Sequence, residues 1–229
     1  MTKQLYPIHL FDRGWISSGD KNQTYGLLPY SRPLEFARPT PDFVWLDSVS
    51  PALAKVIDET STLFAEENEL KSWPAISKEI NQRKLQLPNT FALLIESPKL
   101  QKKIPTCTAC FLSLSEELIP VPGVSDHFLL RFLNDSQSCF LWYLFLSAHH
   151  APYVVASPYF FDPDIFKAME YEDVTRDELV SKSYLCAETF LEFIFRFWLE
   201  NTVWYAECKK LELSDMQQAY KSSGYANRF

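Results

Sequence analysis

Residues 139–146 constrain the fold of this chain more than any other segment, because all eight are apolar. Successive side chains of a β-strand point to opposite faces of its sheet, so a strand formed here presents apolar side chains on both faces. Both faces then have to be covered, which is typical of a central strand. We therefore predict a sheet in which this strand is central, with a helix on one face and a further layer on the other.

Three other extended runs accompany this strand, at residues 111–114, 127–133 and 153–157. Turn-forming residues separate the runs, at Pro120, Pro122 and Gly123, at 134–136 and at 148–152. Short connections of this kind join antiparallel neighbours. The predicted fold class is α+β, with a mostly antiparallel sheet of about four to six strands, N-terminal helices and a long aromatic C-terminal helix packed on the sheet.

The C-terminal region carries the helix expected to cover the sheet, over residues 185–208. Its apolar and charged side chains fall on opposite stripes at helical spacing. The apolar stripe consists of Phe190, Phe193, Ile194, Phe197 and Trp198, and the charged stripe of Glu192, Arg196, Glu200 and Glu207. A short closing helix is predicted over 214–221, because Ser214 suits an N-cap and Gly224 follows the end.

Three shorter helices are expected before the sheet. Ser50 and Pro51 are a typical helix start, and apolar residues then recur at helical spacing as far as Phe64. A second helix is predicted over 74–84. A third begins at Leu87-Pro88 and ends before Pro98.

Residues 1–45 hold five prolines and three of the five glycines of the chain, without sustained periodicity. This composition favours an irregular segment, with short strands at most. Eight aromatic residues lie in the same stretch, and side chains of this type are usually buried in part. We predict that 1–45 is an irregular arm packed on a single α+β domain formed by 46–229.

The cysteine count and the apolar runs predict a soluble cytoplasmic protein. Five cysteines, an odd number, favour reduced thiols over a disulfide framework. The first 20 residues are interrupted by Pro7, Asp12, Arg13 and Gly14, which does not suit a secretion signal. The longest apolar run, 139–146, is far shorter than the ~20 residues that a membrane helix requires. We therefore expect no membrane partner.

Charge and glycine content exclude several function classes. A net charge of −7 disfavours nucleic-acid binding, which needs clustered positive charge. Gly123 is the only glycine between Leu27 and Ser223, so neither a phosphate-binding loop nor a dinucleotide-binding turn can form. The chain also lacks the Gly-x-Ser-x-Gly and His-Glu-x-x-His motifs of hydrolases. We expect no cofactor and no catalytic activity.

Two residue groups keep other functions open. Cys107 and Cys110 have the spacing of a zinc or redox pair, but no second pair accompanies them. We expect these thiols to pack as small apolar groups. A small hydrolase or a ligand-binding domain would instead use a pocket near Asp126, His127, Asp135, Gln137 and the turn at His149 and His150. We expect these histidines to be ordinary exposed loop residues.

Charge is segregated along the chain into three blocks, with net charges of −5 over 58–69, +5 over 71–103 and −5 over 162–178. Solvation of helix faces would account for each block alone. In the last block, however, acids alternate with apolar residues that could anchor a basic partner protein. The predicted partner-binding residues are Asp162, Asp164, Phe166, Met169, Glu170, Tyr171, Glu172 and Asp173.

Four segments resemble the SUKH superfamily, which contains fungal cell-wall-synthesis regulators and bacterial immunity proteins. Leu87-Pro88 followed by Phe91, Leu93 and Leu94 is similar to a helix of that family. Residues 128–146 resemble its strand, turn and strand, 154–157 its next strand, and 190–204 its closing helix. The resemblance covers residues 50–210 and rests mainly on core positions. The segment 97–108 and the N-terminal arm depart from the family pattern.

The resemblance implies an adaptor, or an immunity protein that neutralises a toxin by occluding it. Such toxins are often nucleases or deaminases, and an acidic surface would suit a basic toxin domain. The leading hypothesis from the sequence is therefore a non-enzymatic protein-binding domain.

Overall fold

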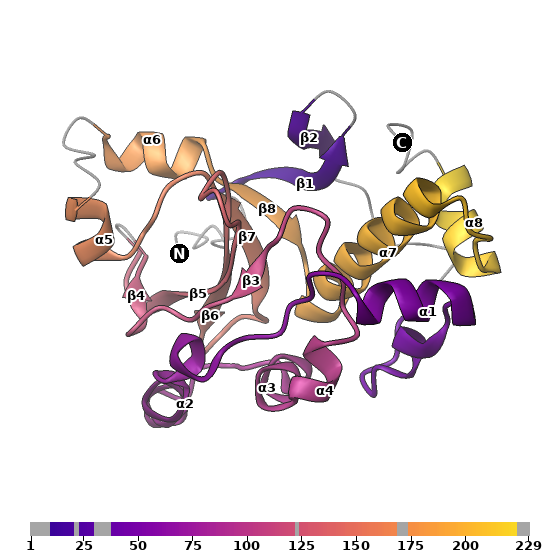
Figure 1. Ribbon diagram of the computed structural model, residues 1–229. Helices are drawn as coiled ribbons and strands as arrows, with labels where there is room; N and C mark the ends of the chain where they lie inside the picture. The colour runs from indigo at the N-terminus through magenta and orange to yellow at the C-terminus, as the bar shows by residue number, and fades with distance from the viewer. Residues whose placement is uncertain (1–9, 21–22, 30–37, 122–123, 169–173, 224–229) are drawn as a thin grey trace.

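The computed structural model describes residues 10–20, 23–29, 38–121, 124–168 and 174–223 (Figure 1). Its centre is a mixed sheet with the strand order β2-β1-β8-β7-β6-β5-β3, and β4 also pairs with β5. The strands are β1 (Asp12–Asp20), β2 (Gln23–Pro29), β3 (Phe111–Leu112), β4 (Ile119–Pro120), β5 (His127–Asn134), β6 (Leu141–Ser147), β7 (Tyr153–Ser157) and β8 (Tyr184–Ala187). The predicted α+β class is confirmed.

Helices cover both faces of this sheet. The helices are α1 (Pro51–Asp58), α2 (Trp73–Gln82), α3 (Asn89–Glu96), α4 (Pro98–Gln101), α5 (Pro163–Ala168), α6 (Arg176–Ser181), α7 (Phe190–Lys209) and α8 (Asp215–Ser222). In Figure 1, α7 lies on one side of the sheet with α1 and α8 beside it, whereas α5 and α6 lie on the other side. Among the described residues, no helix has both the length and the hydropathy needed to cross a membrane.

Strand β6 is the central, doubly covered strand that its composition predicts. All seven of its residues are buried. Trp142 and Leu144 belong to the main core, which includes Phe193 of α7. Tyr143 and Phe145 point to the opposite face, where a second core contains Phe161 and Leu179. The neighbouring strands β5 and β7 both pair with β6 in antiparallel orientation.

The prediction of about four to six strands was too low, because the sheet contains eight. Two of the additional strands, β1 and β2, form an antiparallel hairpin in the segment expected to be irregular. This hairpin joins the sheet because β1 pairs in parallel with β8 at Asp12 and Arg13. Trp15, Ile16 and Tyr25 of the hairpin are buried. Residues 1–45 contain five prolines, but none of them lies within β1, and β2 contains a proline only at its last residue.

Two predicted helices have different ends in the structure. The first was expected to reach Phe64 but ends at Asp58, because the following chain turns back and pairs with another segment: Leu63 N donates to Ile104 O at 2.9 Å. The C-terminal helix was expected from 185, but residues 184–187 form β8 and the helix begins at Phe190. Thr189 caps it, with Oγ1 accepting from Glu192 N at 3.1 Å.

Candidate partner-binding pocket

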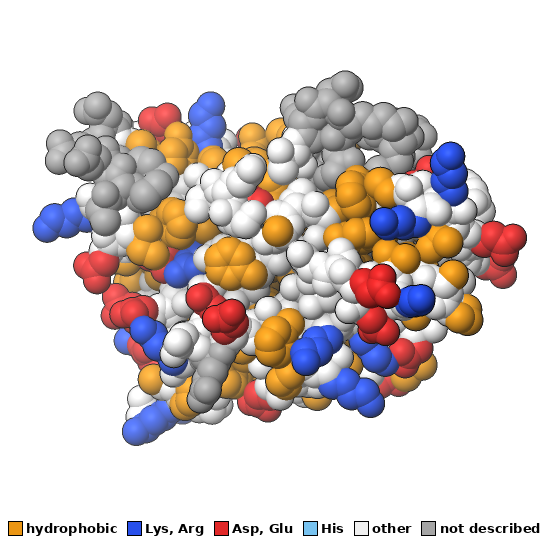
Figure 2. Space-filling model, in the orientation of Figure 1, with side chains coloured by type: hydrophobic (Ala, Val, Ile, Leu, Met, Phe, Trp, Pro, Cys, Tyr) orange, Lys and Arg blue, Asp and Glu red, His pale blue; other side chains and the backbone are white. Residues whose placement is uncertain are grey.

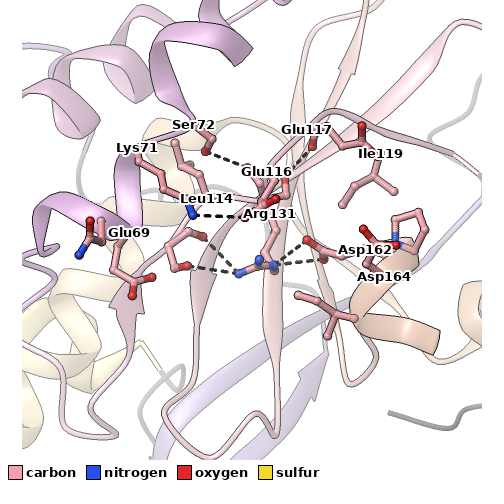
Figure 3. Close-up of a pocket in the computed structure, with 15 residues that line it drawn as sticks. Glu69, Lys71, Ser72, Leu114, Glu116, Glu117, Ile119, Arg131, Asp162 and Asp164 are labelled. Carbon is pink, nitrogen blue, oxygen red and sulfur yellow. Dashed lines mark hydrogen bonds and ion pairs between the residues drawn. The ribbon is translucent and has the colours of Figure 1, made fainter. Parts of the chain in front are cut away.

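A cavity of about 730 Å³ lies beside β5, where the short strands β3 and β4 leave the edge of the sheet. Three chain segments far apart in the sequence line it. They are residues 68–72 before α2, residues 113–119 between β3 and β4, and residues 162–165 at the start of α5, together with Arg131 from β5 (Figure 3). The cavity therefore exists only in the folded chain.

An ion pair between Arg131 and Asp162 forms the floor of this pocket. Arg131 Nε donates to the two carboxylate oxygens of Asp162 at 3.2 and 3.1 Å. The side chains are only 6% and 10% exposed. Arg131 Nη1 also donates to Asn134 Oδ1 at 2.9 Å, and the guanidinium lies 5.6 Å from the centre of the Phe160 ring. A buried charge needs such partners because its desolvation is costly, and the pair as a whole is neutral.

A β-bulge directly follows Arg131 in β5. Along β5 and β6, Arg131 pairs with Tyr143 and Leu133 pairs with Trp142, so the register shifts by one residue between them. Phe132 and Leu133 consequently both belong to the main core, whereas Arg131 extends toward Asp162 on the other side of the sheet. Arg131 itself keeps the regular alternation of the strand, because its pairing with Tyr143 precedes the shift.

One nitrogen of Arg131 remains available to a ligand. Among the described residues, the hydrogen bonds of Arg131 come from Nε and Nη1 alone, to Asp162, Asn134 and Ser113. Nη2 donates to none of them, and Arg131 lines the cavity. A donor on a largely buried side chain at the bottom of a pocket favours an incoming acceptor.

Carboxylates surround the mouth of the pocket. Five lining residues are acidic and two are basic, so the lining has a net charge of −3. Glu116 forms an ion pair with Lys71 at 3.3 Å, but both side chains are more than half exposed. Exposed ion pairs contribute little to stability. Within the described chain, Glu69, Glu117 and Asp164 have no ion-pair partner. Figure 2 shows acidic side chains on the side of the molecule where α5 and β4 lie, interrupted by a few basic ones.

The structure describes three of the eight predicted partner-binding residues. Asp162 lies on the floor of the pocket and Asp164 at its mouth. Phe166 belongs to α5, but its side chain is not among those described. The other predictions, Met169, Glu170, Tyr171, Glu172 and Asp173, lie outside the described residues.

Sequence reasoning missed Arg131 and the contribution of 113–119. An arginine between Leu130 and Phe132 in a strongly apolar strand is a signal that could have indicated a buried polar site. The acids Glu116 and Glu117 are visible in the sequence, but nothing local indicates that they meet Asp164.

Cys110 lies in a buried polar cluster at the hairpin. Its Sγ is 3.3 Å from Tyr25 Oη and 3.2 Å from Thr108 Oγ1. Burial raises the pKa of the Cys110 thiol to about 12, so the thiol is protonated near neutral pH, whereas the thiolate is the form that binds metals and attacks electrophiles. In the part of the chain that the structure describes, no group of three or more potential metal ligands occurs.

The histidine turns come together, but the other residues of the alternative site do not. The rings of His127 and His150 stack with centroids 5.8 Å apart and an angle of 18° between their planes. Asp135 lies beyond the far end of β5, where it accepts a hydrogen bond from Tyr25. The eight residues of β5 span about 25 Å. Asp135 and His127 therefore cannot share one small pocket.

The fold and the pocket together define an α+β domain with an acidic cavity at one edge of its sheet. Comparisons with family models, with curated proteins and with solved structures find no match to this chain.

Proposed function

We propose that this chain is a non-enzymatic protein-binding domain of SUKH type, and specifically an immunity protein that neutralises a toxin by direct binding. The observation that carries the proposal is the convergence of Glu69, Glu117 and Asp164 on one cavity from three distant segments. Each segment contributes an acid without an ion-pair partner among the described residues. Acids that line one cavity give it a negative potential, which favours a basic partner.

The charge of the pocket supports a basic partner. A nuclease or deaminase toxin carries a positive surface where it holds its substrate, and the negative field of this domain would accelerate its approach. The partner would then cover the surface that it uses for its substrate. No chemistry on the part of this chain is required.

Carbodiimide cross-linking in the native cells tests this proposal, because the reagent joins carboxylates to lysines in direct contact. The tagged chain is expected to form one dominant cross-linked species with a basic protein, and the purified partner is expected to lose its toxic activity at one equivalent of the chain. The matched variant replaces Glu69→Gln, Glu117→Gln and Asp164→Asn. The control replaces three exposed acids elsewhere, Asp58→Asn, Glu59→Gln and Glu212→Gln.

Loss of inhibition of the purified partner by the pocket variant, with retention in the control, is the expected result, because amide side chains cannot form the cross-link whether or not the partner binds. A purified chain that binds no protein from its own cells, or a cross-linked partner whose activity is unaffected by the complex, would contradict the proposal.

A further inference from the structure

We propose that the pocket receives a basic side chain of a peptide segment together with a neutral carbonyl of the same segment. The cation lies at the mouth, between Glu69, Glu117 and Asp164, and the carbonyl oxygen accepts from Arg131 Nη2 at the floor. This inference rests on the proposed function and specifies its chemistry, because it names what a partner inserts.

The distribution of charge determines where each group of the ligand lies. Arg131 and Asp162 neutralise each other at the floor, so the floor has no net attraction for an anion. A carboxylate at Arg131 would also approach Asp162, whose charge would repel it. A neutral acceptor satisfies the available Nη2 donor without that repulsion. The floor therefore selects a carbonyl or amide oxygen over a carboxylate or phosphate.

The mouth of the pocket, unlike the floor, favours a positively charged group. Its acids outnumber its bases, and the partly exposed Glu69 and the exposed Glu117 and Asp164 can accept hydrogen bonds from a guanidinium or ammonium group. Leu114, Ile119 and Ile165 also line the cavity. They provide an apolar wall for the methylene stem of an arginine or lysine. A single basic residue within a peptide carries the cation, the stem and the carbonyl in one unit.

The size of the cavity fits such a segment. A cavity of about 730 Å³ falls within the ~300–1,000 Å³ range of ligand sites in proteins. It is larger than one side chain needs, so the flanking backbone can enter as well. A bare metal ion is not the expected occupant, because the described residues contain no metal-ligating cluster.

Nuclear magnetic resonance titration of the ¹⁵N-labelled full chain tests this inference with defined probes. The main probe is N-acetyl-arginine N-methylamide, which has the cation and the carbonyls. The n-butylguanidinium ion has the same head group and stem but no carbonyl, and N-acetyl-glutamate N-methylamide has the opposite charge. The signals to follow are the backbone amides of 69–72, 114–117 and 164–165, and the Nε–H of Arg131.

The arginine probe is expected to shift all of these signals. n-Butylguanidinium should bind about fivefold more weakly, corresponding to one lost hydrogen bond, and leave the Arg131 signal in place. The glutamate probe should cause no shift. The variant Glu69→Gln/Glu117→Gln should weaken binding of the arginine probe about fivefold, whereas Glu212→Gln, an exposed change outside the pocket, should not.

Three results would overturn the inference: equal binding of the glutamate probe, equal binding and equal Arg131 shifts with n-butylguanidinium, or unchanged affinity in the double variant. These results are distinct from failure of the proposed function. A chain that does not bind the arginine probe, but is cross-linked to a basic partner through another face, would refute only the inference that the pocket binds a basic side chain and a carbonyl. A chain that binds the probe but has no protein partner would refute the proposed function.

Discussion

The hydroxyl of Tyr25 donates a hydrogen bond of 2.6 Å to Asp135 Oδ1, and this contact joins the N-terminal hairpin to the turn between β5 and β6. Asp135 Oδ2 in turn accepts from the backbone amides of Gln137 and Cys139 at 3.1 and 3.0 Å. The carboxylate therefore holds the turn and the hairpin in one network. Asp135 is 1% exposed and Tyr25 9% exposed, so water replaces lost partners poorly.

Tyr25→Phe is expected to lower the free energy of unfolding by about 1–3 kcal/mol, because it leaves a buried carboxylate without its strongest side-chain donor. Urea denaturation followed by circular dichroism measures this change. The matched control is Tyr184→Phe, because the Tyr184 hydroxyl has no hydrogen bond among the described residues and the same atom is removed. Equal stability of the two variants would show that the Tyr25 hydroxyl does not hold the hairpin.

Tyr220 provides a similar link for the C-terminal helix. Its hydroxyl donates to Glu200 Oε1 at 2.6 Å, and Trp15 Nε1 donates to the same oxygen at 2.7 Å. One carboxylate of α7 thus holds α8 and β1. We expect Tyr220→Phe to cost about 1–3 kcal/mol and to accelerate hydrogen exchange of the α8 amides more than that of the β6 amides. Uniform acceleration across both elements would show instead that α8 does not open separately.

Stability should decline in alkaline solution. Burial raises the pKa of Cys110 and of Cys186 from 9.0 to about 12, and burial also raises the pKa of Tyr25 and of Tyr143. In the unfolded chain these groups lose their protons near their ordinary pKa values, while the folded chain still binds them. The unfolded state therefore binds fewer protons, and the free energy of unfolding falls with rising pH.

The decrease in the free energy of unfolding is absent below the ordinary pKa of the thiols. It becomes larger from pH ~9 to pH ~12. Urea midpoints at a series of pH values measure it, and absorbance at 295 nm reports tyrosine ionisation. We expect the buried tyrosines, Tyr25 and Tyr143 among them, to ionise in one cooperative step together with loss of circular dichroism. Gradual ionisation of all tyrosines in the folded chain, at their ordinary pKa, would contradict this expectation.

The local sequence predicts an element when the residues of that element, or those next to it, indicate how it is buried or where it ends. Strand β6 was predicted because its unbroken apolar composition requires burial on both faces. Helix α3 was predicted to within a residue or two because Pro88 and Pro98 flank it. The place of the hairpin β1–β2 in the sheet was not predicted, because its pairing with β8 joins residues about 170 positions apart, and no short-range pattern carries that information.

The pocket was predictable only in part, for the same physical reason. Asp162 and Asp164 stand out as acids beside apolar residues, but Glu69 and Glu117 reach them only through the path of the chain along the edge of β5. Arg131 follows the ordinary alternation of β5, but its partner Asp162 lies 31 positions further along the chain.

The Arg131–Asp162 pair yields the sharpest test of how the pocket floor is held. Asp162→Leu leaves the guanidinium without its counter-ion and should cost about 3–5 kcal/mol, as should Arg131→Met, which leaves the carboxylate unpaired. The double variant Arg131→Met/Asp162→Leu removes both charges and should be more stable than either single variant. Urea denaturation of the four proteins measures the coupling. If the two single effects instead add in the double variant, the pair does not act as a unit, and the neutrality of the floor is not the reason for its stability.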